Sequence, residues 1–371
     1  MYDNLSLLPN PEWIGDRGHV SRQQQSNTIN DGKGVLVRST KPELASGLTE
    51  RSIFHEPWWL EAATNGAWRV AEVKHGNTVV GEMPYTFTQK ALWQISTLPP
   101  LTRTLGPVIR PHQSGAGERD WSQRLGIARD LIAQLPRYAH FHQIMDPRVS
   151  EAEALAFRLE GFTVKVAFTL VSAGWPDEAT AFAALRSTAR TAVRRAQECL
   201  TVGPIDSANA FLDFYNANLA VRNLDNKHET TTMGRLLHEA MIRGACTLLG
   251  AFDSKGALVA GTVLLWETQK MYYFLSTRRQ DAHSGAVSLL IWSAMCMAGK
   301  RNLSFDFDGI SSAGILNFLR GFGGCLVQRF EVERTMPLYA ALRTTLHGAR
   351  AITAVAKPAQ SSGEASEPSR I

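Results

Sequence analysis

Apolar and polar segments follow one another in the same order in the two halves of the chain. Residues 68–87 and residues 246–266 each consist of two apolar runs separated by a short polar turn, a pattern that predicts a β-hairpin. Further along, residues 157–171 and 318–333 each contain a helical segment that ends in Gly-Phe and then another strand. The amino-acid sequences of the two copies differ, and so do the lengths of the segments between the hairpin and the Gly-Phe closure. We therefore expect a repeat of architecture, with one copy in each half.

A glycine closes the helical segment in each copy. Gly161 and Gly321 stand directly before the phenylalanine. A helix that stops and reverses into a strand often ends on a residue with positive φ, which glycine adopts without steric cost. A single Gly-Phe of this kind is typical of an ordinary helix end, whereas two of them downstream of matching hairpins favour a repeated fold.

Other helices and strands are indicated between these landmarks. Apolar residues recur at helical spacing, and Ser150 followed by Glu153 forms a capping-box pattern at the start of one helix. The predicted helices span residues 52–64, the region around 125–135, and residues 150–161, 179–198 and 285–298, and further strands span residues 270–277 and 303–309. Along the last of these strands Asp306 and Asp308 alternate with phenylalanines, so we expect both aspartates on one face.

The length of 371 residues suits two domains of ordinary size. Both ends of the chain are rich in the polar residues that are typical of flexible segments. We expect a flexible arm over residues 1–34, a first module over 35–172, a second module over 173–345, and a helix end with a flexible tail over 346–371.

Composition excludes several classes of protein. No run of 18 apolar residues occurs, and the first residues lack the basic start and apolar run of a secretory signal, so we expect a cytoplasmic protein without an integral membrane span. The four cysteines form no CxxC pair, and we expect no disulfide and no metal site. No Gly-x-Ser-x-Gly elbow or Walker loop is present, which argues against a hydrolase and an NTPase. The formal charge of +5 is spread along the chain, and we expect no DNA partner.

Arginines recur along one predicted helix. Arg186, Arg190 and Arg194 follow one another at four-residue spacing, with Arg195 beside them. Like charges at this spacing each cost a helix roughly 0.2–0.5 kcal/mol, so helix stability does not explain them. They are either a solvated basic face or a site for an anionic ligand, and the sequence leaves both interpretations open.

Several segments resemble one family of proteins. They are FHEPWWLEA (residues 54–62), GEMPYTF (81–87), ALRSTARTAVRRAQE (184–198), YYFLST (272–277), and FDFDGI followed by FLRGFGG (within 305–324). With these segments in this order, the chain resembles the FemAB-like, or BioF2-like, acyltransferases of the GNAT (N-acetyltransferase) superfamily. The resemblance implies an α/β fold of two tandem GNAT-like modules, each a mixed β-sheet flanked by helices. It also implies an enzyme that transfers an acyl group from an activated carrier to an amine.

The carrier that the resemblance implies is acyl-coenzyme A, either acetyl-CoA or a longer acyl-CoA, as a cosubstrate without a metal. The branch of the family that builds peptidoglycan bridges uses aminoacyl-tRNA instead, and it usually has Phe-Lys before the Gly-Phe closure. Here Phe318, Leu319 and Arg320 stand at that place. Leu319 argues against a cell-wall precursor as the acceptor, whereas Arg320 could supply the charge from the next position and is a candidate for substrate binding.

The loop from Arg278 to Ala286 is the place where a GNAT module would hold the pyrophosphate of coenzyme A. Backbone N–H groups at a helix N-terminus bind phosphate readily, and Ser284, Gly285 and Ala286 suit a close approach of the backbone. Arg278 or Arg279 could add positive charge. The family's usual glycine spacing is not matched in register, so an ordinary strand-to-helix loop is the alternative.

Tyr273 and Asp308 are the candidates for proton transfer. Tyr273 follows Tyr272 on a predicted strand, so at most one of the two faces the cleft. A tyrosine there could protonate a departing thiolate, or it could belong to the core. Asp308 could accept the amine proton or bind the acceptor, or it could form a turn at the end of its strand. Arg190 and Arg194 are further candidates for substrate binding.

We therefore expect an acyl-CoA-dependent N-acyltransferase that acts on an amino sugar, a nucleotide-linked sugar or another small amine, with a role in polysaccharide or cell-envelope synthesis. Two alternatives stay open. One is an aminoacyl-tRNA-dependent transferase of the peptidoglycan-bridge type, in which the recurring arginines contact tRNA phosphates. The other is a GNAT-like scaffold that binds a ligand without turnover. The oligomeric state is not predicted.

Overall fold

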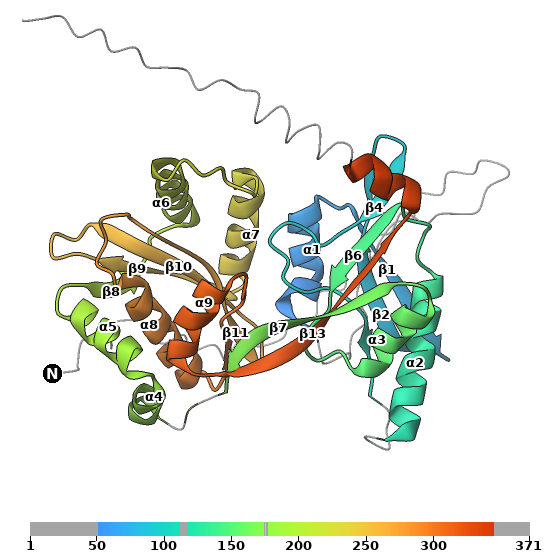
Figure 1. The fold of residues 1–371 in the computed structure, drawn as a ribbon, viewed down its shortest axis with the longest axis horizontal. Coiled ribbons are helices and arrows are strands. Elements are labelled where there is room, and N and C mark those ends of the chain that lie inside the picture. Colours follow the sequence, from blue (N-terminus) through green and yellow to red (C-terminus); the bar gives the residue numbers. More distant parts are fainter. Residues whose placement is uncertain (1–50, 112–116, 174, 176, 345–371) are drawn as a thin grey trace, which may run out of the picture. The chain divides into compact units, whose positions relative to one another are not determined.

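The computed structural model describes residues 51–111, 117–173, 175 and 177–344. They all belong to one compact unit over residues 42–371 (Figure 1). The arm and the tail predicted at the two ends of the chain lie outside the described residues. Within the described ranges, no helix is both long enough and apolar enough to cross a bilayer.

Helices and strands form a mixed α/β fold, as the sequence predicts. The elements of the first half are η1 (Ile53–His55), α1 (Pro57–Thr64), β1 (Trp68–His75), β2 (Thr78–Thr86), β3 (Thr88–Lys90), β4 (Trp93–Ser96), β5 (Val108–Ile109), α2 (Glu118–Ala133), β6 (His140–Ile144), α3 (Glu151–Leu159) and β7 (Thr163–Ser172). Those of the second half are α4 (Glu178–Ala184), α5 (Ser187–Gln197), β8 (Thr201–Pro204), α6 (Ala208–Val221), α7 (Thr230–Ile242), β9 (Cys246–Phe252), β10 (Leu258–Trp266), β11 (Lys270–Arg278), α8 (Ala286–Lys300), β12 (Ser304–Asp306), α9 (Ala313–Leu319), η2 (Arg320–Phe322) and β13 (Cys325–Thr335). The two predicted hairpins are β1–β2 and β9–β10, and each is antiparallel.

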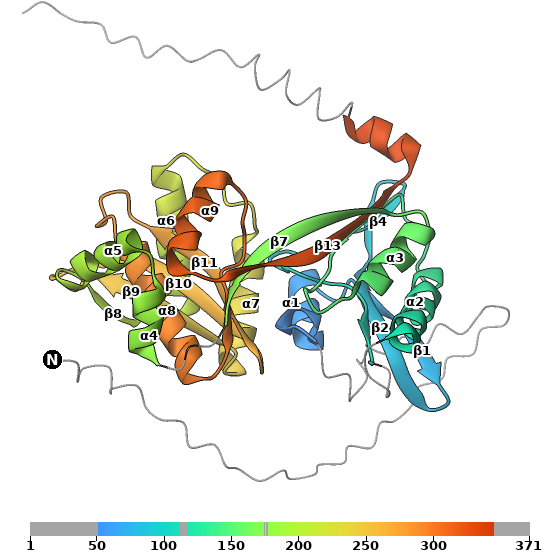
Figure 2. The ribbon, with the colours of Figure 1, turned by 60° about the horizontal axis from the view of Figure 1, so that its bottom comes forward.

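Strands of both halves share one sheet. Its order is β3-β4-β6-β13-β7-β12-β11-β10-β9-β8, while β1, β2 and β5 form a separate sheet of three strands. β13 lies between β6 and β7 and is antiparallel to both, although the whole second half separates it from them in the sequence. β7 also pairs with β12, and Figure 2 shows β7 and β13 side by side as a long ribbon between the two halves. One sheet therefore joins strands of the two predicted modules. The boundaries of these modules stay a prediction.

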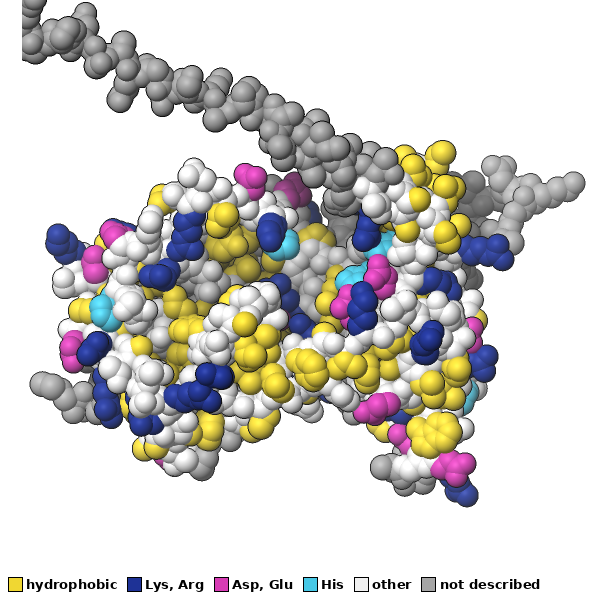
Figure 3. Space-filling view, viewed as in Figure 1, with side chains coloured by type: hydrophobic (Ala, Val, Ile, Leu, Met, Phe, Trp, Pro, Cys, Tyr) yellow, Lys and Arg dark blue, Asp and Glu magenta, His cyan; other side chains and the backbone are white. Residues whose placement is uncertain are grey.

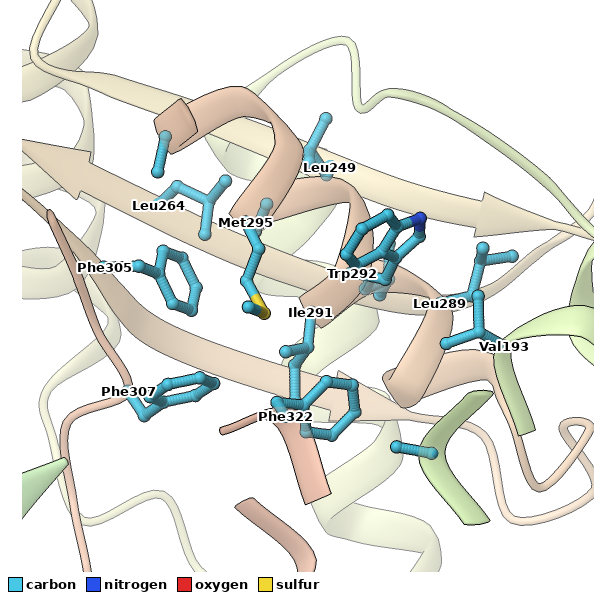
Figure 4. Close-up of a cluster of buried hydrophobic side chains, with 14 of the residues drawn as sticks. Val193, Leu249, Leu264, Leu289, Ile291, Trp292, Met295, Phe305, Phe307 and Phe322 are labelled. Carbon is cyan, nitrogen blue, oxygen red and sulfur yellow. The ribbon is translucent and has the colours of Figure 1, made fainter. Parts of the chain in front are cut away.

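Helix α8 covers one face of the second-half strands. Its buried side chains contact buried side chains of β9, β10 and β12 (Figure 4), among them Leu289, Ile291, Trp292, Met295, Leu249, Leu264 and Phe305. Each large apolar side chain removed from water contributes about 1.5–3 kcal/mol to folding. Leu264 faces this cluster, whereas its neighbours Val263 and Leu265 belong to a second cluster with α6, α7 and α1. The second-half strands are therefore covered on both faces, in part by a helix of the first half.

The two Gly-Phe closures differ in backbone conformation. Gly161 follows α3 with a φ of 82°, which confirms the prediction for the first closure. At the second closure, Gly321 lies within the 3-10 turn η2 and Gly323 takes the positive φ of 86°. The prediction for Gly321 is wrong because the helix continues into η2 before the chain reverses.

The helix predicted over residues 179–198 is two helices, α4 and α5. Leu185 and Arg186 between them are extended, with ψ of 148° and 151°. The N–H of Arg186 donates to the carbonyl oxygen of Gly321 at 2.9 Å. A long-range contact that no local pattern reveals therefore interrupts the helix. As a consequence, Arg186 precedes α5 and does not share a helical face with the other arginines.

The strand predicted over residues 303–309 is shorter than expected and ends at Asp306. Asp306 is buried, and its carboxylate accepts a hydrogen bond from the hydroxyl of Thr169 at 2.5 Å. Asp308 lies beyond the strand with a φ of 44°. The two aspartates do not lie on one strand face as predicted, because the chain turns between them.

Helices α5 and α8 approach one another closely at Gly285. A Cβ atom at this position would overlap the carbonyl oxygen of Ala192 and lie 3.1 Å from the Cβ of Ala196. Packing alone therefore requires glycine here, whatever the loop binds.

Replacing Gly285→Ala should lower the free energy of unfolding by about 1–3 kcal/mol, because the two helices must move apart. The control is Gly299→Ala near the other end of α8, where an added Cβ meets no atom within 4 Å. That variant should be up to about 1 kcal/mol more stable than the parent, since alanine is the better helix former. Urea unfolding followed by tryptophan fluorescence measures both, and equal stability of the two variants would contradict this account of the packing.

Candidate functional site

Strands β11 and β12 separate near the middle of β11. They pair in parallel from Lys270 opposite Ser304 as far as Tyr272 opposite Asp306. β11 then continues to Arg278, whereas β12 has ended. The carboxyl ends of parallel strands are where α/β sheets commonly bind ligands.

A bulge interrupts the other edge of β11 at the same level. Val263 of β10 is opposite Leu275, and the next residue, Leu264, is opposite Tyr273, so Phe274 has no partner on β10. A bulge of this kind turns backbone groups and side chains away from their regular directions. The carbonyl of Phe274 accepts a hydrogen bond from the Arg103 guanidinium at 2.6 Å.

A cavity of about 510 Å³ opens where the two strands part. Its walls come from β11, α8, α9 and β13 and, in the first half, from β6 and the irregular segment around residues 98–103. Most of the lining is apolar, for example Ile144, Phe307 and Phe318. Figure 3 shows this face of the molecule hollowed between α9 and β6, with basic side chains inside the hollow. The volume and the apolar walls are typical of a small-molecule site.

Charged side chains of the cavity gather around Asp308. Its carboxylate forms an ion pair with Arg103, and its Oδ1 lies 4.0 Å from the nearest nitrogen of Arg329. The Arg103 guanidinium also lies over the ring of Phe274, 4.7 Å from the centroid. Arg103 comes from the first half and Arg329 from β13, so residues remote in sequence meet here.

Tyr273 lines the cavity. Its hydroxyl is buried, and the side chains of Ser276 and Thr262 lie within reach of it. Burial raises the pKa of Tyr273 to about 12, so the hydroxyl is protonated at neutral pH and can act only as a proton donor. The neighbouring Tyr272 is fully buried in the second cluster, in agreement with the expectation that at most one of the pair faces the cleft.

The loop before α8 uses several of its predicted phosphate ligands internally. The N–H of Gly285 donates to Nδ1 of His283 at 3.1 Å, and the N–H of Ala286 donates to the His283 carbonyl at 2.9 Å. Ser284 is exposed. The next two N–H groups of the helix, those of Val287 and Ser288, have no acceptor among the described residues, and Val287 lines the cavity. The groups that remain for an anion therefore lie one and two residues beyond Ala286, the last of the predicted ligands.

The loop's two arginines have partners of their own. Arg279 forms an ion pair with Asp281, with 2.9 Å between its Nε and the carboxylate. The carbonyl of Arg278 accepts a hydrogen bond from Arg222 at 2.6 Å. Neither arginine lines the cavity at the separated strands, and their role in cofactor binding stays a prediction.

The three arginines predicted to bind substrate do not line this cavity. The guanidinium of Arg190 donates to the carbonyl oxygens of Ala183, at 3.0 Å, and Leu185. That of Arg194 lies over the ring of Phe182, 5.3 Å from its centroid. Arg320 is exposed and directly follows the cavity residue Leu319. Binding of substrate by these arginines stays a prediction.

Arg103 and Arg329 are cavity residues that the sequence analysis did not identify. Arg103 lies in a proline-rich passage without regular periodicity, and Arg329 stands between Gln328 and Phe330 in a strand where any solvent-facing arginine could stand. No local pattern distinguishes either residue. Within the parts of the chain that the structure describes, no group of three or more metal-ligating side chains converges.

One protein-family model matches part of the second half. Residues 183–313 match the acetyltransferase (GNAT) domain family. Among curated proteins, no relative of the sequence is found.

One solved structure shares the fold at low sequence identity, and two further structures are similar to a lesser degree. A crystal structure of FemX has a TM-score of 0.58 and 13% identity, covering 76% of this chain and 92% of its own. The C-terminal domain of a putative lysylphosphatidylglycerol synthetase from Agrobacterium fabrum has a TM-score of 0.48 and 12% identity, with 79% of this chain and 91% of that chain covered. A tandem GNAT protein from the clavulanic acid pathway has a TM-score of 0.44 and 13% identity, with 72% and 83% covered.

The contacts of Arg190 lead to a test of its role. Arg190→Gln should lower the free energy of unfolding by about 1.5–3 kcal/mol, because glutamine is too short to replace the charge-assisted hydrogen bonds at the end of α4. Arg195→Gln, an exposed position on the same helix, should stay within about 0.5 kcal/mol of the parent. Thermal and urea unfolding of both variants measure the difference. An unchanged stability of Arg190→Gln would mean that this arginine is free to serve a ligand.

Proposed function

We propose that the chain is an acyltransferase of the GNAT type, as the match of residues 183–313 to the acetyltransferase (GNAT) domain family supports, and that it transfers an acyl group from acyl-coenzyme A to the nitrogen of a small amine. The acceptor is an amino sugar, a nucleotide-linked sugar or a similar amine. The observation that carries the proposal is the cavity between β11 and β12, which has apolar walls, unpaired N–H groups of α8 on one side and ionisable groups on another.

The donor fits the side of the cavity formed by β11 and α8. The N–H groups of Val287 and Ser288 suit a phosphate, because the first turn of a helix attracts negative charge. From there the parted strands give a thioester a path toward the bulge at Phe274. Apolar side chains such as Phe307 and Phe318 suit the acyl chain.

The proposed reaction requires little covalent chemistry from the protein. The amine nitrogen attacks the thioester carbonyl, the new C–N bond forms and the C–S bond breaks. The amine loses one proton, and the departing thiolate takes one. Holding the two reactants together in the correct orientation supplies much of the rate.

The departing thiolate takes its proton from a side chain of the cavity, and the proton that the amine loses passes to water. The buried hydroxyl of Tyr273 is the proton donor for the thiolate. Asp308 offers the acceptor amine a carboxylate oxygen, Oδ1, because Arg103 pairs with its other oxygen, Oδ2. We assign Asp308 to binding and orienting the amine.

Two further features support acyl-CoA over aminoacyl-tRNA as the donor. Leu319 occupies the place of the lysine that the bridge-building branch usually has, and it is a buried part of the cavity wall. Arg190 and Arg194, which an RNA ligand would need, contact backbone carbonyls and Phe182.

Acyl-CoA should raise the melting temperature of the purified protein, since a ligand at 100 times its Kd stabilises the folded state by about 2.7 kcal/mol. Free thiol should be released when a panel of amines is added. If acyl-CoA donors from acetyl to long chain change neither the melting temperature nor the thiol signal, the proposed donor is wrong. Binding of bulk tRNA at low salt would then favour the other carrier.

Tyr273→Phe should lower kcat by about 100-fold, because general acid catalysis typically contributes at least that factor. The KM for acyl-CoA should change little. With a pKa near 12, Tyr273 stays protonated throughout the usual range, so kcat of the parent should show no ionisation of this group between about pH 6 and 10. The control is Tyr85→Phe, at a partly buried tyrosine outside the cavity, which should keep full activity. A Tyr273→Phe enzyme with unchanged kcat would remove the proposed proton donor.

A further inference from the structure

The guanidinium of Arg329 lacks a hydrogen-bond acceptor among the described residues. Its side chain is only 13% exposed, and its Nε is buried without a partner. The nearest carboxylate oxygen, Oδ1 of Asp308, is 4.0 Å from its terminal nitrogen, which is beyond hydrogen-bonding range. Arg329 nevertheless lines the cavity between the parted strands.

Two other poorly exposed arginines, Arg124 and Arg148, are well paired. Arg124 lies 2.6 Å from a carboxylate oxygen of Glu153. Arg148 lies 2.7 Å from Asp146 and 3.1 Å from Glu267. Removing a charge from water is costly unless hydrogen bonds replace those of water. Arg329 is therefore short of a partner that the other two possess.

Arg103 increases the positive charge beside Arg329. It is fixed in place by the Phe274 carbonyl, the Phe274 ring and Asp308. Of the charged residues that line the cavity, two are arginines and one is an aspartate, so the site carries a net positive charge. A ligand with a negative group would balance it.

We propose that Arg329, together with Arg103, binds an anionic group of the acceptor, so that the acceptor is an amine that also bears a carboxylate or a phosphate. This inference rests on the proposed function. The amino group of such a molecule lies at Asp308, where it loses its proton to water before it attacks, and its anionic group lies at the two arginines. The guanidinium fork suits carboxylate and phosphate oxygens alike.

The anion at Arg329 belongs to the acceptor and is separate from the phosphates of the donor. Arg329 and Arg103 come from β13 and from the first half, whereas the unpaired N–H groups belong to α8. Two anion sites on different elements are what a reaction between a coenzyme A thioester and an anionic amine requires.

The test compares amines in matched pairs, with acetyl-CoA as donor and thiol release as the signal. The pairs are glucosamine with glucosamine 6-phosphate, ethanolamine with phosphoethanolamine, and cadaverine with lysine. In at least one pair, the parent enzyme should use the anionic member with a kcat/KM at least 10-fold higher. A preference for glucosamine 6-phosphate or phosphoethanolamine indicates that the anionic group is a phosphate. A preference for lysine over cadaverine indicates that it is a carboxylate.

Arg329→Gln should abolish that preference by raising the KM for the anionic amine about 10-fold or more, with a much smaller effect on the KM for the neutral amine and on that for acetyl-CoA. Arg329→Lys, which keeps the charge, should retain part of the preference. The matched control is Arg334→Gln on the same strand, whose guanidinium lies over the ring of Phe162, 4.1 Å from its centroid, and this variant should keep the full preference. Circular dichroism checks the folding of each variant.

A second measurement does not depend on turnover. Calorimetric titration with the anionic member of each pair should show binding to the parent with a Kd at least 10-fold lower than to Arg329→Gln. The inference would be overturned if the enzyme used acetyl-CoA with charged and neutral amines equally well and if Arg329→Gln changed neither rate. That result would leave the proposed function standing. Absence of any turnover would contradict the proposed function. The calorimetric comparison would still decide the role of Arg329, because equal Kd values for the parent and Arg329→Gln would refute binding of the anionic group by this residue.

Discussion

The pairing of β13 between β6 and β7 is the constraint on which the site depends. β13 begins beside the far end of β7, where Cys325 pairs with Val171, and it ends beside β6, where Thr335 pairs with His140. This register places Arg329 opposite Ala167 and so determines where its guanidinium lies relative to Asp308. A slip by one residue would turn the guanidinium to the other face of the sheet. The cavity is therefore a product of both halves of the chain.

The separation of β11 from β12 creates the space of the cavity, and the pairing of β13 with β6 and β7 encloses it. Strands that part leave backbone groups without ladder partners, and such groups need other acceptors or donors. Here Arg103 supplies one partner, for the carbonyl of Phe274. Around it the walls are mostly apolar, and charges in an apolar enclosure interact more strongly than in water. For this reason the guanidinium of Arg329, which lacks an acceptor, favours a ligand that carries a negative group.

Local patterns predicted the hairpins and helix α8, because each depends on neighbouring residues and on turns that glycine permits, and the family resemblance implied the α/β class. The break between α4 and α5 could not be predicted, since it results from a bond between Arg186 and Gly321. The same holds for Arg103 and Arg329, which come to Asp308 through strand pairing over most of the chain. Tyr273 was identified because a tyrosine on this predicted strand can face the cleft and donate a proton, and Asp308 because it stands at the carboxyl end of its predicted strand, where position already indicates a site.

The central claim is that the acyl donor binds where β11 and β12 part. Hydrogen–deuterium exchange of the full chain, with and without saturating coenzyme A, tests it most directly because it reports which backbone N–H groups the ligand protects. The account predicts slower exchange at residues 273–278 of β11 and at Val287 and Ser288 of α8, with little change in α5 or in the first hairpin. Protection confined to α5 or to the first hairpin, with β11 and α8 unaffected, would contradict it.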